Sequence, residues 1–389
     1  MKIRLLTEKD LDQYQKISYQ AYPGLRDFSE EGQRNYRAQV GKSLGEKNEE
    51  DFYGAEEDGR LLGVFRHIHF QMNLFGKLVP VAGFGYLAVD PFYKKQGIAS
   101  KLLNFFEEKA LEAGENLGLL LPFRPDFYHI HGYGYLGKMN LYRLDPLSLP
   151  KAEADYTYKE ISPKEALDFR IQATDKVHGL TLPLEVEKET YVEDLATIYL
   201  GCYQEGRLIA TAIYHWESLN ESNYTKNALV LDDLLALDGQ GYLGIFSYLR
   251  TQADQAQYIQ FFSQEKNLVH YFQNPTDTSD FYFANGYLQT NIQAIGLMAK
   301  VLDPVALYKT LYPQGPHLSI GLGEKEVKTG PNPSLSLRTS DQVLASLFCK
   351  EISFQDLHFL GLAKCPEKDL DQLANLFPGG YTIHNNADF

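Results

Sequence analysis

The sequence predicts an α/β fold in which two similar units, each with a mixed central sheet, precede a smaller α+β unit. Apolar strands alternate with amphipathic helices over most of the chain. The turn and strand Gly59-Arg60-Leu61-Leu62 return as Gly206-Arg207-Leu208-Ile209, and Gly132-Tyr133 returns as Gly286-Tyr287 at a similar offset. Such self-similarity indicates a tandem duplication. The expected units are residues 1–147, 148–290 and 291–389.

Composition narrows the class of protein before any motif is considered. The 389 residues are 44% hydrophobic and carry a net charge of −14, which argues against nucleic acid or an anionic membrane as a partner. An acidic protein is compatible with cationic substrates. The three cysteines form no CxxC pair, so a disulfide framework is not expected and a reducing cytoplasm fits best. No stretch approaches the ~20 apolar residues of a membrane helix, so no membrane partner is expected.

In the first unit, each element follows from a local pattern. Residues 3–6 alternate as a short strand, and Thr7 with Asp10 forms a capping-box start for a helix. An apolar strand over residues 83–89 stops at Asp90-Pro91, because proline cannot donate to a ladder. A helical stripe then begins at Gly97 and ends near residue 114, and residues 117–121 read as a buried strand.

The second unit repeats this plan more weakly. Residues 206–211 and 229–237 predict strands, and residues 241–249 predict the following helix. In the last hundred residues the pattern changes to strand 295–301, helix 304–312 and strand 317–321. A hairpin over 321–333, strand 334–337, helix 340–347 and a tail over 372–389 complete the smaller unit.

The run Lys94-Lys95-Gln96-Gly97-Ile98-Ala99 is the motif with the clearest chemistry. Glycine lets the backbone approach a ligand closely, and a helix that begins there presents unsatisfied N–H groups at the positive end of its dipole. Two lysines add mobile positive charge. The motif predicts a pyrophosphate site, although many helices with nearby lysines bind nothing.

The order strand, basic turn, helix, strand and then Phe127-Tyr128-x-x-x-Gly132-Tyr133 resembles the GCN5-related N-acetyltransferase (GNAT) superfamily. In that superfamily Arg/Gln-x-x-Gly-x-Gly/Ala holds the pyrophosphate of acetyl-coenzyme A. Here Lys94 replaces Arg or Gln, which keeps the charge but loses the planar fork. The whole chain resembles the enhanced-intracellular-survival acetyltransferases, which have two GNAT-like domains and a sterol-carrier-protein-like C-terminal domain. That resemblance rests on Leu87-Ala88-Val89, the basic turn, Tyr128, residues 297–303 and a final phenylalanine.

The resemblance implies a set of contacts to acetyl-CoA. Leu87–Val89 are expected to offer backbone groups to the pantetheine arm, and the turn to bind phosphates. The expected cofactor-binding residues are Leu87, Ala88, Val89, Lys94, Lys95, Gln96, Gly97, Ile98, Ala99, Ser100, Phe123 and Arg124.

Two residues are expected to move protons. Tyr128, a phenol with an ordinary pKa of about 10, is placed to protonate the leaving thiolate, unless it is a core tyrosine. The α-carboxylate of Phe389 is implied as the base for the attacking amine, and burial or a water relay would have to strengthen so weak a base. Asp388 is expected to hold the substrate ammonium. The alternative for this polar tail is a frayed terminus.

No metal is expected. His67 and His69 alternate on a strand and can share a face, but the sequence shows no cysteine or carboxylate to complete a tetrahedral set. In the second unit, Leu237-Asp238-Gly239-Gln240-Gly241-Tyr242 replaces the basic turn, and its aspartate would repel a pyrophosphate.

The resemblance implies an acetyl-CoA-dependent N-acetyltransferase that acts on a multi-amine acceptor such as an aminoglycoside, a polyamine or a lysine side chain. The resemblance implies a hexamer. A non-catalytic acyl-CoA sensor or lipid carrier remains the alternative, and it would be indifferent to loss of the Tyr128 hydroxyl.

Overall fold

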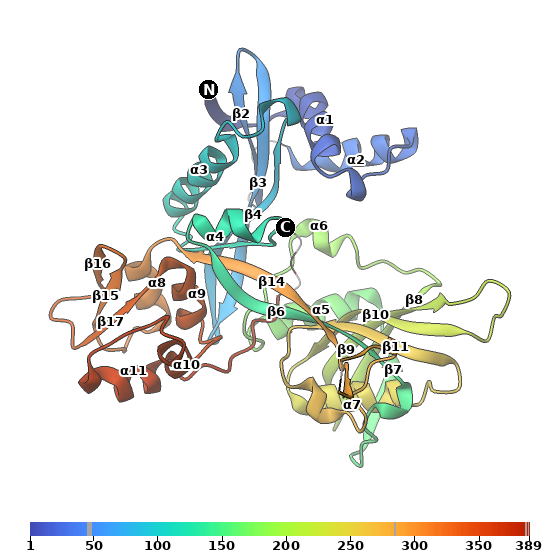
Figure 1. Cartoon of the computed structure of the whole chain (residues 1–389). Coiled ribbons are helices and arrows are strands. Elements are labelled where there is room, and N and C mark those ends of the chain that lie inside the picture. Colours follow the sequence, from blue (N-terminus) through green and yellow to red (C-terminus); the bar gives the residue numbers. More distant parts are fainter. Residues whose placement is uncertain (45–48, 284, 386, 388) are drawn as a thin grey trace.

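The computed structural model describes residues 1–44, 49–283, 285–385, 387 and 389. Within them, one sheet of 12 strands runs through both predicted units, in the order β1-β2-β3-β4-β5-β14-β6-β11-β10-β9-β8-β7 (Figure 1). Its strands are β1 (Lys2–Leu5), β2 (Glu50–Glu57), β3 (Arg60–Leu74), β4 (Lys77–Val89), β5 (Leu117–Leu120), β6 (Gly134–Leu144), β7 (Tyr156–Glu160), β8 (Thr197–Gln204), β9 (Arg207–Ser218), β10 (Asn227–Ala236), β11 (Ala256–Ser263) and β14 (Ile292–Val301).

The first unit is organised around the long hairpin of β3 and β4. Its turn at Phe75-Gly76 has positive φ at both residues, and Asn73 accepts a hydrogen bond from the Gly76 N–H at 2.8 Å. Such a turn matches the twist of the two strands. Because neighbouring strand residues point to opposite faces, Val64 packs toward one side of the sheet and Phe65 toward the other.

Helices cover both faces of this hairpin. The helices α1 (Leu11–Ala21) and α2 (Glu30–Ser43) pack on the Val64 face, and α3 (Ile98–Glu112) packs on the Phe65 face. The predicted capping box of Thr7 and Asp10 forms at the start of the first helical segment. The short helix α4 (Pro125–Ile130) follows β5.

The second unit repeats the plan with β8–β11, α5 (Pro163–Thr174) and α7 (Gly239–Arg250) around an apolar core of its own. Strand β11 pairs antiparallel with β6 of the first unit, with Ile259 opposite Leu144. The two predicted units therefore share one continuous ladder of backbone hydrogen bonds.

The strand predicted at residues 295–301 forms, as β14, but in an unexpected place. It lies between β5 and β6, with Met298 opposite Leu120 and Leu297 opposite Leu136, so the expected third unit gives its first strand to the large sheet. Residues 296–299 are buried, which is typical of a strand covered on both faces.

The remaining C-terminal residues form a small α+β layer against the face of β3 and β4 that lies opposite α3. A three-stranded sheet in the order β16-β15-β17 is covered by helices, and its core is continuous with Ile68 and Phe70 of β3. Its elements are α8 (Pro304–Leu311), β15 (Leu318–Leu322), β16 (Lys325–Lys328), β17 (Leu335–Thr339), α9 (Asp341–Phe348), α10 (Phe354–Phe359) and α11 (Leu370–Leu376). The predicted hairpin and helices of this region are thereby confirmed.

After α11 the chain runs past residues 178 and 179 of the second unit toward β4 of the first. The His384 N–H donates to the His178 carbonyl at 3.0 Å, and the Asn385 side chain donates to the Gly179 carbonyl at 3.2 Å. The end of the chain lies beside β4 and the short helix α6 (Glu185–Lys188) (Figure 1). None of the helices in the described part of the chain combines the length and hydropathy that a membrane span requires.

Candidate active site

Strand β4 separates from β5 in the middle of the sheet. The two parallel strands pair only at Ala82–Gly118 and Gly83–Leu119, and β4 then continues six residues further without β5 beside it. Strand β4 also has a bulge where it pairs with β3. Arg66 of β3 pairs with Gly85, and Val64 pairs with Ala88. Two residues of β4, Tyr86 and Leu87, therefore lie opposite a single residue of β3. Tyr86 has a φ of 47°, an uncommon value for a bulky side chain. The expected Leu87–Val89 segment therefore borders an open wedge.

The basic turn leads directly into α3. Lys95 and Gly97 both have positive φ, and no side chain caps the first N–H groups of the helix among the described residues. Lys94 and Lys95 are exposed, and within the part of the chain that the structure describes neither has an acidic partner. Successive N–H groups in such a turn form a concave anion site. The predicted residues from Lys94 to Ala99 thus surround the uncapped backbone N–H groups at the start of α3.

The other predicted cofactor residues differ in their surroundings. The Ser100 hydroxyl lies 3.1 Å from Nε2 of His131, at the end of α4. Phe123 is 76% exposed and its ring meets that of Tyr22 edge-on, at 6.1 Å between centroids. Arg124 pairs with Asp126, so its guanidinium already has an acidic partner.

Tyr128 lies on α4, under the α3 side of the sheet. Its ring packs edge-on against Phe84 of β4 and Phe127, with centroids 6.4 and 5.1 Å away. The side chain is only 6% exposed, and its hydroxyl has no hydrogen-bond partner among the described residues. Burial raises the pKa of Tyr128 well above its usual value, so the phenol stays protonated.

Phe389 reaches the same strand from the opposite face. A Cβ built on Gly85 would lie 2.5 Å from the carboxyl carbon of Phe389, so that carbon lies directly over the Gly85 backbone. The Phe389 ring meets Phe70 at 5.4 Å. Asp388, expected to hold a substrate ammonium, lies outside the described residues.

Residues Phe84 and Gly85 are adjacent on β4 and therefore face opposite sides of the sheet. Tyr128 contacts the first, and the Phe389 carboxyl group contacts the second. The structure thus brings the two predicted proton-transfer groups to the two faces of one strand, at the edge of the wedge.

An acidic cleft adjoins the Phe389 face. It has a volume of about 900 Å³ and lies between α2, the start of β2 and α6. Four glutamates line it, Glu49, Glu50, Glu185 and Glu189, against one lysine, Lys42. Glu50 also pairs with the buried Arg66 at 2.6 Å, and Arg66 is the residue that pairs with Gly85 across the strands. The Glu50–Arg66 ion pair thus joins the cleft to the β3 position opposite Gly85, over which the Phe389 carboxyl carbon lies.

Residues 2–136 match the family model described as an acetyltransferase (GNAT) domain. This part of the chain is a GNAT acetyltransferase domain. The protein is accordingly an acyltransferase, and the fold predicted from the sequence is confirmed.

Solved structures share the fold over the whole chain. A GCN5-related N-acetyltransferase from Kribbella flavida is 17% identical, with a TM-score of 0.74, over 100% of this chain and 98% of that one. Eis1 from Mycobacterium abscessus is 15% identical, with a TM-score of 0.76, over 100% of both chains. A probable N-acyltransferase from Enterococcus faecalis V583 is 15% identical, with a TM-score of 0.73, over 100% of this chain and 99% of that one. No curated protein sequence matched the chain.

In the second GNAT-like unit, the backbone N–H groups at the start of the corresponding helix, α7, are not free to bind a phosphate. At the start of α7 the Asp238 side chain accepts hydrogen bonds from the N–H groups of Gln240 and Gly241, at 2.9 and 3.1 Å. The groups that would meet a phosphate are therefore already bonded.

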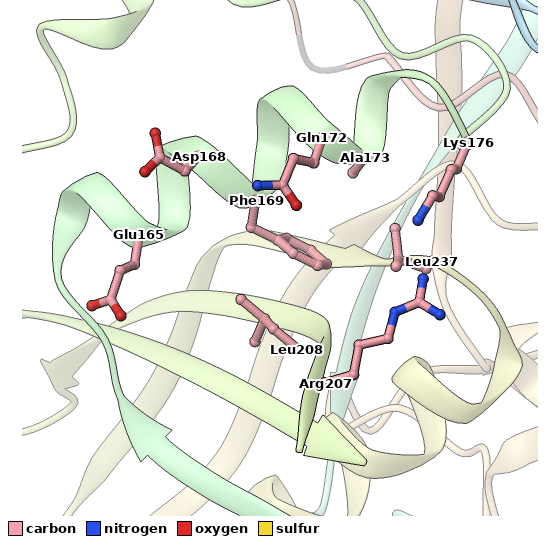
Figure 2. Close-up of a pocket in the computed structure, with 9 residues that line it drawn as sticks. All are labelled: Glu165, Asp168, Phe169, Gln172, Ala173, Lys176, Arg207, Leu208 and Leu237. Carbon is pink, nitrogen blue, oxygen red and sulfur yellow. The ribbon is translucent and has the colours of Figure 1, made fainter. Parts of the chain in front are cut away.

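A pocket of about 340 Å³ in the second unit lies between α5 and the start of β9 (Figure 2). Lys176 and Arg207 lie together at one end, and Glu165 and Asp168 lie on the helix toward the other. No histidine, cysteine or tyrosine lines it among the described residues.

The expectation that no carboxylate accompanies His67 and His69 is wrong. Glu115, in the loop between α3 and β5, lies 2.8 Å from His67 Nε2 and 2.6 Å from His69 Nδ1. The predicted sharing of one face by the two rings is confirmed, with centroids 4.2 Å apart. Sequence reasoning missed Glu115 because it is separated from the histidines by more than 40 residues of chain.

Reasoning from the sequence also missed Tyr22, Arg66 and Gly85. The Tyr22 hydroxyl donates to the Leu87 carbonyl at 2.6 Å, and burial raises the pKa of Tyr22 to about 12. Glycine at 85, within the apolar run before the basic turn, was the available signal, since glycine inside a strand often marks a bulge or a close approach.

Proposed function

We propose that the protein transfers an acetyl group from acetyl-CoA to a primary amine of a cationic acceptor. The observation that carries the proposal is the placement of Tyr128 and the Phe389 carboxyl group on opposite faces of β4, at the edge of the wedge. The uncapped N–H groups of α3 and the unpaired Lys94 and Lys95 fit the pyrophosphate of the donor.

Direct transfer requires three proton movements. The carboxylate of Phe389 accepts a proton from the substrate ammonium, and the freed amine attacks the thioester carbonyl carbon. The tetrahedral intermediate collapses as the C–S bond breaks, and the Tyr128 hydroxyl donates its proton to the leaving sulfur. The acceptor nitrogen loses its second proton as the amide forms, and that proton restores the Tyr128 hydroxyl. Tyr128 is protonated at neutral pH because burial raises its pKa, and its hydroxyl has no competing acceptor among the described residues.

The acidic cleft supports a cationic acceptor. Of the four glutamates that line it, Glu50, Glu185 and Glu189 have basic partners, whereas Glu49 has none among the described residues. Glu49 therefore offers a negative charge that attracts amines. An aminoglycoside, a polyamine or a lysine-rich peptide meets this requirement. We extend the proposal to the arrangement of Eis-like enzymes: Asp388 as a substrate contact, a sterol-carrier-protein-like unit from about residue 291, and a hexamer in the cytoplasm.

The proposal is tested by thiol release from acetyl-CoA with N-terminally tagged protein, across a panel of aminoglycosides, polyamines and peptides. We expect release that depends on the amine. Deleting Phe389 should reduce kcat and leave acetyl-CoA binding intact, because the carboxyl group lies at Gly85 and not in the basic turn. Glu49→Gln should raise KM for polycations more than for monoamines.

The alternative to a transferase is a non-catalytic acyl-CoA sensor, which would use the basic turn and need neither proton-transfer group. A sensor would bind acetyl-CoA with no amine-dependent release. That result with every amine of the panel would contradict the transferase proposal.

A further inference from the structure

Three side chains of the GNAT domain meet at a place that acetyl transfer does not use. His67 and His69 extend from the α3 face of β3, and both contact the carboxylate of Glu115. Their potential ligand atoms lie within 4.8 Å of one another. His67 and Glu115 are 1% and 3% exposed as side chains, whereas His69 is 24% exposed and opens the cluster to solvent.

Among the described residues, the side chains of the cluster have one polar contact beyond its own members. His69 Nε2 lies 3.5 Å from Asp51, which in turn accepts a hydrogen bond from the Tyr53 hydroxyl at 3.2 Å. On its other side the His67 ring packs edge-on against Phe106 at 4.9 Å, and its buried Nδ1 has no partner among the described residues.

This arrangement has the features of a first and a second coordination layer. A histidine that binds a metal usually donates its other ring N–H to a carboxylate or carbonyl, which fixes the tautomer. Asp51 lies on the Nε2 side of His69, at 3.5 Å, in the position of such a partner. Without a metal, His69 Nδ1 and His67 Nε2 each donate to the Glu115 carboxylate, and a bound metal would displace those two protons. Two imidazoles and one carboxylate, with an open fourth position, are a common donor set for zinc.

We propose that His67 Nε2, His69 Nδ1 and Glu115 bind a divalent transition metal of the zinc class. Imidazole donors favour zinc over calcium or magnesium, which prefer oxygen ligands. The side chains separate slightly, since an ion between them needs bonds of about 2.0–2.2 Å to each donor atom. Water fills the remaining position from the exposed side of His69.

The site is structural. His67 is separated from Tyr128 by the rings of Phe106 and Phe84, which contact each other at 4.8 Å. A metal here ties the loop after α3 to the middle of β3, and so fixes the helix whose first turn carries the phosphate-binding N–H groups.

The test uses the full chain without a histidine tag, stripped with a chelator and dialysed against Zn²⁺ or Co²⁺. We expect one metal per chain by elemental analysis, and Co²⁺ absorption bands of the intensity typical of four-coordinate sites. Glu115→Gln and, separately, His69→Gln should abolish stoichiometric binding. Asp51→Asn should weaken it by roughly 10–100-fold, as loss of a second-layer partner does.

His215→Asn is the matched control, since His215 is also a strand histidine paired with an aspartate, at 2.8 Å, but lies in the second unit. It should leave binding unchanged. Wild-type protein that binds no Zn²⁺ or Co²⁺ in stoichiometric amount would overturn the proposal, whatever the variants do. Binding that survives both Glu115→Gln and His69→Gln would also overturn it.

Discussion

Tyr128 combines a buried ring with a hydroxyl that makes no hydrogen bond to the described residues. Tyr128→Phe removes the proton donor and no hydrogen bond, so we expect folding to be unchanged. General-acid catalysis is typically worth about 10²–10⁴-fold, so kcat should fall within that range while KM for acetyl-CoA changes little. Steady-state thiol release with a fixed amine measures both constants.

Tyr135→Phe is the control for this change, because Tyr135 is also in the GNAT domain but is 48% exposed on β6. It should leave kcat and KM at wild-type values. A Tyr128→Phe variant with wild-type kcat would assign Tyr128 to the core rather than to the chemistry.

His178 makes the anchoring of the tail depend on pH. Its Nδ1 accepts from the Phe75 N–H and its Nε2 donates to the Cys349 carbonyl, both at 3.2 Å, so only the neutral ring fits. Burial lowers the pKa of His178 to about 4, from about 6.5 in the unfolded chain. The stabilisation is complete above pH 6.5 and is lost as the pH falls toward 4.

We expect this residue to contribute about 1–3 kcal/mol to acid destabilisation between pH 6.5 and 4. Urea unfolding of the wild type and of His178→Gln across that range isolates the contribution, since other titrating groups are common to both. Parallel curves for the two proteins would contradict the assignment.

A local motif named Lys95 and Gly97, and the structure places both in the turn before α3 with positive φ. Glu115 and Arg66 were not predictable from the sequence, since their significance comes from partners that the fold brings to them from other segments. The Phe389 carboxyl group was named by family resemblance. Its placement over Gly85 depends on a tail path that no local pattern encodes.

Among the elements, β4 with its bulge positions most of the candidate site. Gly85→Ala places a methyl group 2.5 Å from the Phe389 carboxyl carbon, closer than any real contact, so the chain end must move. We expect kcat to fall at least about tenfold, as misplacement of a catalytic group does, with acetyl-CoA binding retained. Isothermal titration gives the binding, and thiol release gives kcat.

The control for this substitution is Gly41→Ala in α2, where the new methyl group would meet only Leu11, at an ordinary 3.7 Å. It should leave kcat unchanged. If Gly85→Ala retained full kcat, the chain end would not take part in the reaction.

The two lysines of the basic turn before α3 should contribute positive charge to acetyl-CoA binding and little to the stability of the fold. Lys94→Ala and Lys95→Ala remove exposed cations that have no acidic partner in the described structure. We expect KM for acetyl-CoA to rise several-fold, with an effect that shrinks as salt is added, and the melting temperature to stay constant. Lys101→Ala, one turn further along α3, should have a smaller effect. Equal effects at all three positions would indicate general charge rather than a phosphate site.

Most elements of the first unit could be predicted from the sequence, because capping residues, proline stops and helical periodicity are local. The position of β14 could not. Its pattern specifies a strand buried on both faces but does not name the neighbours, and pairing with β5 and β6 is decided by topology.

For the molecule as a whole, the continuous sheet predicts cooperative unfolding. Strand β11 of the second unit pairs with β6 of the first, and β14 fills the space between β5 and β6. We expect one coincident transition by far-UV and near-UV circular dichroism, and a fragment of residues 1–147 that does not fold, since its sheet lacks a central strand. Two separated transitions, or a folded fragment, would contradict this prediction.

The sequence indicated the number of repeats and the fold class of the whole molecule, and the structure and comparisons confirm that class. The joining of the units into one sheet was not predictable, because it depends on which strand edges remain open after each unit forms.

The central position of β14 also imposes an order on synthesis. Strands β5 and β6 leave the ribosome early, but the strand that joins them is translated only after the entire second unit. Throughout that interval the nascent chain carries two unpaired strand edges, which are prone to pair with other chains. Trigger-factor-like chaperones, translation speed between residues 144 and 292, and growth temperature should therefore govern the yield of this protein in the cell.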